Sequence, residues 1–142
     1  MSYTLNFSQP ELKALSMAIH TVIRAGQKKE PEMKQHSLEY KVLAENKAIQ
    51  EVLNTAAKVF ELNPDKPEVA VELTRTQLKV AVTTIITIYT MQEKTLKQYE
   101  ALPDTHAAFE DVEGRRRSDY MGRLKERMAD VEAVANKLKE LV

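Results

Sequence analysis

The chain has no cysteine and no tryptophan, and it has little glycine, proline or aromatic side chain. The absence of cysteine excludes a disulfide framework, thiolate chemistry and cysteine metal sites. Because aromatic residues make up only 6% of the chain, a core must consist mostly of Leu, Val, Ile, Met and Ala. The three glycines and five prolines lie outside or at the edges of the periodic segments. This distribution favours long helices joined by short connections.

An excess of one charge is lacking as well. The 21 basic residues are balanced by 21 acidic ones, so no global field steers the chain toward nucleic acid or an anionic membrane. The longest run without charge or proline, 80–92, is shorter than the ~20 residues of a bilayer span. The first residues also lack the pattern of a signal peptide. We expect a single cytoplasmic domain, 1–142, that does not enter a membrane.

The uncharged run 80–92, VAVTTIITIYTMQ, is the segment around which the chain is organised. Its β-branched residues also suit a strand, but no Gly, Pro or Asn lies between Glu68 and Leu102 to turn a hairpin. Asp65 is a candidate N-cap, Pro67 suits a first turn, and Glu68 follows the cap by three residues. These signals predict a helix over 66–101.

This predicted helix carries small or apolar residues on two opposite sides, whereas a surface helix needs only one such side. One side contains Val69, Leu73, Thr76, Val80, Thr83, Thr87 and Thr90. The other contains Leu78, Val82, Ile85, Tyr89, Gln92 and Leu96. Either other helices of the same chain cover both sides, or a second subunit covers one of them.

Two helices are predicted before this one. Ser8 and Glu11 have the spacing of a capping box, and Gly26 is a candidate helix end, so the first helix spans about 8–25. Residues 1–7 are either extended or folded back over the bundle. The second helix spans about 31–62, starting at Pro31. Its predicted seam is Leu38, Val42, Glu45, Ile49, Val52, Ala56 and Val59, broadened toward the C-terminus by Leu53 and Phe60. Glu45 in that seam either sets the register or marks a bend toward solvent.

A fourth helix is predicted over about 104–141, bent or broken near Gly114 because glycine weakens a helix interior by ~1 kcal/mol. The fold class is therefore all-α, an antiparallel up-down-up-down bundle of four helices. At 1.5 Å per residue, the third helix would be roughly 50 Å long and the first about half of that. One end of the bundle must then be three-helical, exposed, or completed by another chain.

The sequence contains no recognisable catalytic motif. It lacks a Gly-x-Ser-x-Gly elbow and a glycine-rich phosphate loop. His36 and His106 have glutamates nearby, but not in the Glu-x-x-His order of di-iron bundles. We expect no catalytic residue, no cofactor and no metal site, with a metal-dependent enzyme as a distant alternative.

The segment 115–127 is rich in arginine, whose planar guanidinium suits phosphate or carboxylate. Its six cations are Arg115, Arg116, Arg117, Arg123, Lys125 and Arg127. They either contact nucleic acid or a phosphorylated or acidic partner, or pair with acids of the same chain such as Glu110, Glu113 or Glu132. The first reading is the alternative function, that of a regulatory protein.

The main prediction is a non-enzymatic helical-bundle protein that acts through protein–protein interaction. A long uncovered apolar stripe would be an aggregation hazard in a monomer, so we expect a homodimer, or a complex with another helical protein. The predicted interface consists of Val82, Ile85, Ile86, Ile88, Tyr89, Met121, Leu124 and Met128.

Overall fold

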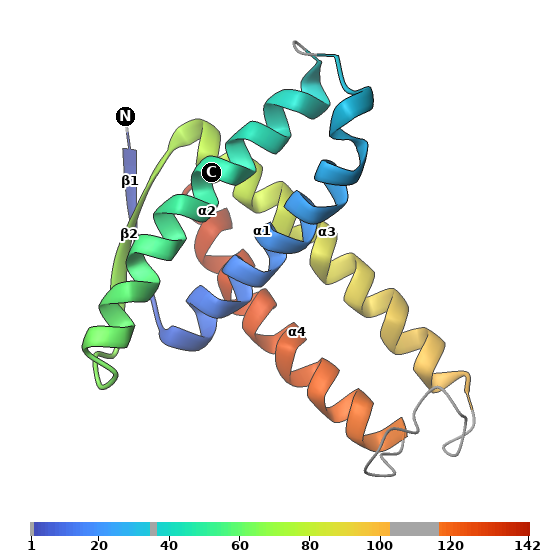
Figure 1. Ribbon diagram of the computed structural model, residues 1–142. Helices are drawn as coiled ribbons and strands as arrows, with labels where there is room; N and C mark the ends of the chain where they lie inside the picture. The colour runs from blue at the N-terminus through green and yellow to red at the C-terminus, as the bar shows by residue number, and fades with distance from the viewer. Residues whose placement is uncertain (1, 35–36, 103–116) are drawn as a thin grey trace.

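A computed structural model describes residues 2–34, 37–102 and 117–142, with the side chains of 117 and 118 left out. These ranges contain four α-helices: α1 (Gln9–Lys29), α2 (Leu38–Leu62), α3 (Arg75–Glu100) and α4 (Arg117–Lys139). They also contain a short 3-10 helix, η1 (Glu30–Glu32), and two strands, β1 (Ser2–Phe7) and β2 (Val69–Thr74) (Figure 1). The mostly helical fold with four helices confirms the prediction at that level. Gly114, where a bend was predicted, lies outside the described residues.

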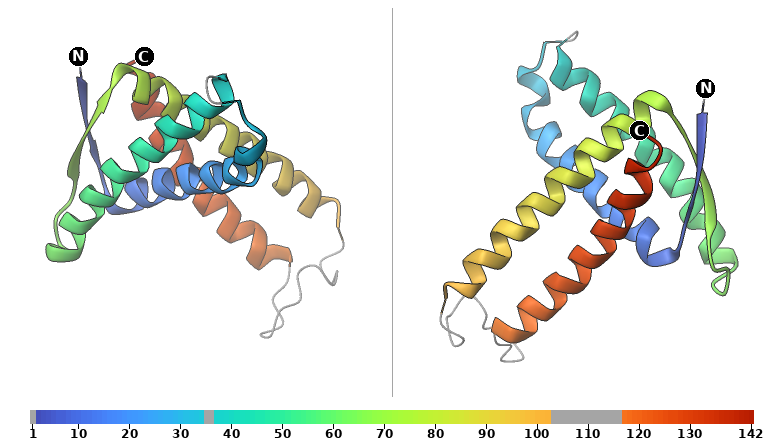
Figure 2. Two further views of the ribbon diagram at one scale, coloured as in Figure 1. Left: turned by 45° about the horizontal axis from the view of Figure 1, so that its top comes forward. Right: turned by 180° about the vertical axis from the view of Figure 1, so that it is seen from behind.

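The helices pack as two antiparallel hairpins, α1 with α2 and α3 with α4. Figure 1 shows that these hairpins cross, so that their axes run in different directions. At the crossing α1 contacts both α3 and α4, and α2 contacts α3. Beyond it α3 and α4 continue side by side as a pair (Figure 2). Neither hairpin covers the other along its whole length.

Strand β2 occupies residues that we predicted as the first turns of the third helix. Val69, Val71 and Leu73 alternate with exposed residues and are buried, the period of a half-buried strand. β2 pairs antiparallel with β1, from Ser2 opposite Thr74 to Phe7 opposite Val69. The predicted start at Asp65 and Pro67 is therefore wrong, because a distant strand supplies the backbone hydrogen bonds that favour the extended conformation.

Helix α3 begins at a different capping box from the one predicted. Thr74 Oγ1 accepts a hydrogen bond from the Gln77 backbone N–H at 3.1 Å, and Gln77 Oε1 accepts one from the Thr74 backbone N–H at 3.0 Å. The cap places the start of α3 directly after the last residue of β2. The run 80–92 is helical, as predicted.

Helix α1 begins at the predicted capping box but passes its predicted end. The Ser8 backbone N–H donates to Glu11 Oε1 at 2.8 Å, and the Glu11 backbone N–H donates to Ser8 Oγ at 3.4 Å. The helix continues through Gly26 to Lys29. A Cβ atom at Gly26 would lie 2.9 Å from Leu43 Cδ1 of α2. Gly26 thus permits close helix packing and does not end the helix.

Helix α2 starts later than predicted, and its buried face is rotated. Pro31 belongs to η1, and Ser37 caps α2 by accepting a hydrogen bond from the Tyr40 backbone N–H at 3.2 Å. Leu38, in the predicted seam, is 77% exposed. The buried residues of α2 are Leu43, Asn46, Ile49, Leu53, Ala56 and Phe60. The buried polar residue of this face is therefore Asn46, and Glu45 beside it is half-buried.

Asn46 links α2 to α3 inside the core. Its Nδ2 donates to the Val42 carbonyl at 3.1 Å, and its Oδ1 accepts a hydrogen bond from Thr84 Oγ1 at 3.2 Å. Both side chains are buried, Asn46 at 0% and Thr84 at 4% exposed. A buried polar group is costly unless it is paired, so this hydrogen bond favours one particular register between the two hairpins.

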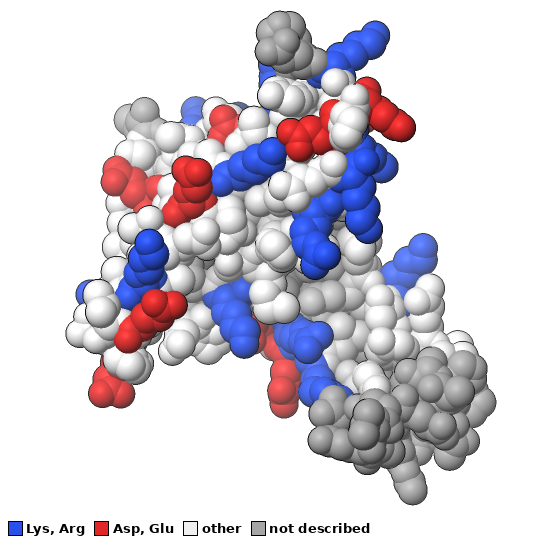
Figure 3. Space-filling view, viewed as in Figure 1, with Lys and Arg blue, Asp and Glu red and all other residues white. Residues whose placement is uncertain are grey.

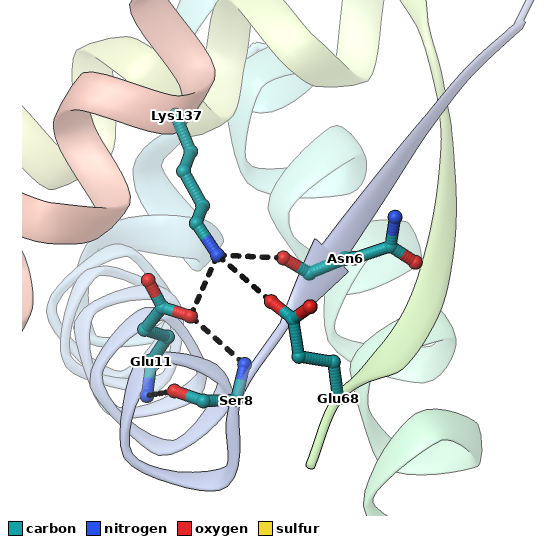
Figure 4. Close-up of polar contacts among 5 residues, drawn as sticks. All are labelled: Asn6, Ser8, Glu11, Glu68 and Lys137. Atoms are coloured by element: carbon teal, nitrogen blue, oxygen red, sulfur yellow. Dashed lines mark hydrogen bonds and ion pairs between the residues drawn. The ribbon is translucent and has the colours of Figure 1, made fainter.

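Lys137 of α4 contacts three other segments of the chain (Figure 4). Its Nζ donates to the Asn6 carbonyl at 2.8 Å, to Glu11 Oε1 at 2.8 Å and to Glu68 Oε2 at 3.2 Å. The last helix is thereby attached to β1, to the first turn of α1 and to the segment before β2. The same ammonium lies 5.8 Å from the centroid of the Phe7 ring, within the range of a cation–π contact.

Glu11 and Lys137 shift each other's titration. Burial alone raises the pKa of Glu11, but its hydrogen bonds with Lys137 and Ser8 outweigh burial, and the pKa lies below 4.5. Burial alone lowers the pKa of Lys137, but its hydrogen bonds with Glu11 and Glu68 raise it above 10.5. The ion pair therefore stabilises the folded state at pH values between the pKa of Glu11 and the pKa of Lys137.

Replacing Thr84 by Val should destabilise the fold, because it leaves the buried Asn46 Oδ1 without a donor. We expect the free energy of unfolding, measured by urea denaturation, to fall by about 1–2 kcal/mol. The matched control is Thr83→Val on the exposed side of the same helix, for which a change within about 0.5 kcal/mol is expected. Equal effects of the two variants would contradict the structural role of the Asn46–Thr84 bond.

Lowering the pH should weaken the Glu11–Lys137 ion pair, because it protonates the Glu11 carboxylate. A group whose pKa is lowered by folding contributes stability above its unfolded pKa and loses it as the pH falls through the lower folded value. The difference in unfolding free energy between the wild type and Glu11→Gln should be greatest while Lys137 is protonated and the pH lies above 4.5, and it should shrink as the pH falls below 4.5. Urea denaturation at a series of pH values measures this difference. A difference that grows on acidification would contradict the assignment.

Candidate interaction surfaces of the α3–α4 hairpin

The α3–α4 hairpin extends beyond the crossing as an arm, residues 86–100 of α3 and 119–127 of α4 (Figure 2). Ile85 is the last buried residue of α3, and Met128 is the first buried residue of α4 among the described side chains. None of the side chains described between these limits is buried. Two helices alone cannot enclose a side chain on all sides. The side chains between α3 and α4 therefore remain partly exposed on both faces of the arm.

One side of the hairpin, which we call the outer face, is mainly apolar. On α3 its residues recur at spacings of four and three, and on α4 at three and four, so each set lies on one side of its helix. The outer face consists of Val82, Ile86, Tyr89, Met121, Leu124 and Met128. Ile86 is 40% exposed. The right-hand view of Figure 2 shows α3 and α4 in front of α1 and α2, with no other element over them.

The predicted interface residues divide among three environments. Six of the eight form the outer face just defined. Ile88 faces the other side of the hairpin, where it lines a groove beside α1. Ile85 is 0% exposed and packs inside its own chain, so its predicted place on a free surface is wrong. The helical period alone could not locate Ile85, because it does not reveal which side of α3 the α1–α2 hairpin covers.

The groove lies between α1 and the α3–α4 hairpin, opposite the outer face, and has a volume of about 550 Å3. Ala14 and Ala18 of α1, Ile88 of α3 and Val131 of α4 contribute its apolar lining. Its polar lining residues include Lys13, Gln92, Arg127 and Asp130. This groove has no signal in the sequence, because it forms only where the two hairpins cross.

Two polar atoms of the arm are buried without a hydrogen-bond partner: Oε1 of Gln92, which lines the groove, and Nη2 of Arg123, one turn before Arg127 on α4. The Arg123 guanidinium lies 5.2 Å from the centroid of the Tyr120 ring, and Tyr120 meets Tyr99 edge to face with centroids 6.3 Å apart. Most buried polar atoms in proteins are paired. The groove side of the arm therefore has unused capacity for polar contacts.

The structure does not gather the predicted basic segment on one side. Arg115 and Arg116 lie outside the described residues, as does the side chain of Arg117. Arg123 and Arg127 are one turn apart and share a side of α4, whereas Lys125, between them, points to the other side. Figure 3 shows Lys and Arg interspersed with Asp and Glu on the face viewed.

Two further classes of site are absent from the described ranges. There, no group of three or more His, Asp or Glu side chains is placed to hold a metal ion. His36 and His106 lie outside these ranges. No helix of the described residues is long and apolar enough to cross a bilayer.

Comparisons with known proteins give no further guide to the site. No protein-family model matches the sequence, and no curated protein or solved structure matches the chain.

A glutamate in place of Ile85 should destabilise the fold, whereas a glutamate in place of the neighbouring Ile86 should not. Ile85→Glu places a carboxylate in the core, so we expect a loss of about 4 kcal/mol or more of unfolding free energy, or an unfolded chain. Ile86→Glu should leave the fold of the chain intact, since that side chain reaches solvent. Circular dichroism with thermal denaturation measures both. Retained stability of Ile85→Glu would contradict the placement of this face of α3.

Proposed function

We propose that this protein acts through protein–protein interaction and that it forms a homodimer in which the outer faces of two α3–α4 hairpins pack together. The observation that carries the proposal is the set of large apolar side chains on the outer face. Their own chain buries Met128 but leaves the other five half-buried or exposed. A second hairpin laid on this face would convert the two-helix arm into a four-helix arrangement with an enclosed seam.

The charges beside the outer face suit a pairing of like surfaces. Glu93 and Lys97 of α3 and Lys125 and Glu132 of α4 are exposed, and the described residues offer none of them an ion pair. In a two-fold interface the same patch meets itself, so it must hold both members of every complementary pair. Both signs are present on both helices, which allows acid and base to meet across such an axis.

The test is the oligomeric mass, measured by sedimentation velocity at several concentrations. The wild type should sediment as a dimer. Ile86→Glu should sediment as a folded monomer, because a buried, unpaired carboxylate at the interface raises the dissociation constant by about a hundredfold or more.

The matched control is Met91→Glu. Met91 is 54% exposed and lies on the opposite side of α3, so the same loss of apolar surface there should leave the dimer intact. A monomeric wild type would overturn the proposal. So would dissociation caused by Met91→Glu and not by Ile86→Glu.

A further inference from the structure

We propose that the groove between α1 and the α3–α4 hairpin binds a small amphiphilic carboxylate, with the apolar chain on the groove floor and the carboxylate at Arg127. The groove lies on the side of the hairpin opposite the outer face, so this proposal does not rest on the dimer. Its volume of about 550 Å3 falls within the ~300–1,000 Å3 of typical small-ligand sites.

The floor of the groove suits an alkyl chain. Ala14 and Ala18 are one turn apart on α1, and Ile88 of α3 and Val131 of α4 complete the apolar lining. Small side chains on α1 leave room for the chain, while the half-buried Ile88 offers contact area. Met17, 51% exposed at the edge of the groove, has an unbranched side chain that adapts to ligands of different shape.

The cations of the groove suit an anionic head group. Lys13 and Arg127 line it from opposite helices, and the described residues provide neither with an ion pair. Arg123 lies one turn before Arg127 on the same side of α4, with its Nη2 buried and unpartnered. Guanidinium groups hold carboxylates through paired N–H donors.

Asp130, the acidic residue that lines the groove, limits where the ligand carboxylate binds. Asp130 follows Arg127 by three residues, whereas Arg123 precedes it by four, so the two lie in opposite directions along α4. Repulsion from Asp130 directs the carboxylate toward the Arg123 side of Arg127. Gln92, across the seam, has a buried Oε1 without a donor. Rotation of the Gln92 side-chain amide exchanges the positions of Oε1 and Nε2. Nε2 then donates a hydrogen bond to the ligand carboxylate.

The test is isothermal titration calorimetry with decanoate below its critical micelle concentration, alongside decylamine at equal concentration. Decanoate should bind at one site per chain, and decylamine, with the same alkyl chain and the opposite charge, should bind at least about tenfold more weakly. No detectable binding of decanoate, or equal binding of the two compounds, would overturn the proposal.

Three variants of exposed or half-buried residues on α4 locate the site. Arg127→Gln should weaken decanoate binding about tenfold, since it removes a charge-assisted hydrogen bond. Lys125→Gln, two residues away on the other side of the helix, should bind as the wild type does. Asp130→Asn should bind decanoate equally or more tightly. Weaker binding by Asp130→Asn, or unchanged binding by Arg127→Gln, would contradict the arrangement.

Discussion

The crossing of the two helical hairpins is the constraint on which the rest of the structure depends. The buried Asn46–Thr84 hydrogen bond fixes the position of α2 on α3 at this crossing. Gly26 acts within one hairpin, where it allows α1 to approach α2 closely at Leu43. Because crossed hairpins meet over only part of their length, α1 and α2 cover one side of α3 and α4 at one end. These two helices leave the opposite side and the far end of the α3–α4 pair uncovered.

This arrangement gives the two sides of one hairpin different chemistry. The outer face is apolar and continuous along both helices, which suits a broad surface such as another hairpin. The groove side combines small residues of α1 with unpaired cations and amide groups, which suits a small molecule with one charged end. The same two helices therefore offer an extended contact on one side and a confined one on the other, without any change in their backbone.

Local signals in the sequence were sufficient for some elements of the fold and not for others. The Ser8–Glu11 capping box was predicted correctly because both partners lie within one turn. The start of α3 was predicted wrongly because VAVELT at 69–74 becomes a strand only when β1 pairs with it. Gly26 was misread for a similar reason, since its close contact is with Leu43 on another helix.

The candidate surfaces were predictable to a similar extent. The helical period placed Val82, Ile85 and Tyr89 on one side of α3, and Ile86 was added to the predicted interface. In the structure Val82 and Tyr89 are half-buried and Ile86 is exposed, whereas Ile85 is fully buried. Only the position of the α1–α2 hairpin determines which edge of an apolar stripe is covered. The groove has no sequence signal of its own, because its lining comes from three helices that meet only in the folded chain.

The contacts of Lys137 also constrain the order of folding events. Its bonds to Glu11 and Asn6 close loops of 126 and 131 residues, and contacts of such long range form late because of the entropy lost on closing them. The α3–α4 hairpin has no such requirement. On the ribosome, the first strand and the first helix must therefore wait for the last helix to emerge before they can be joined to it.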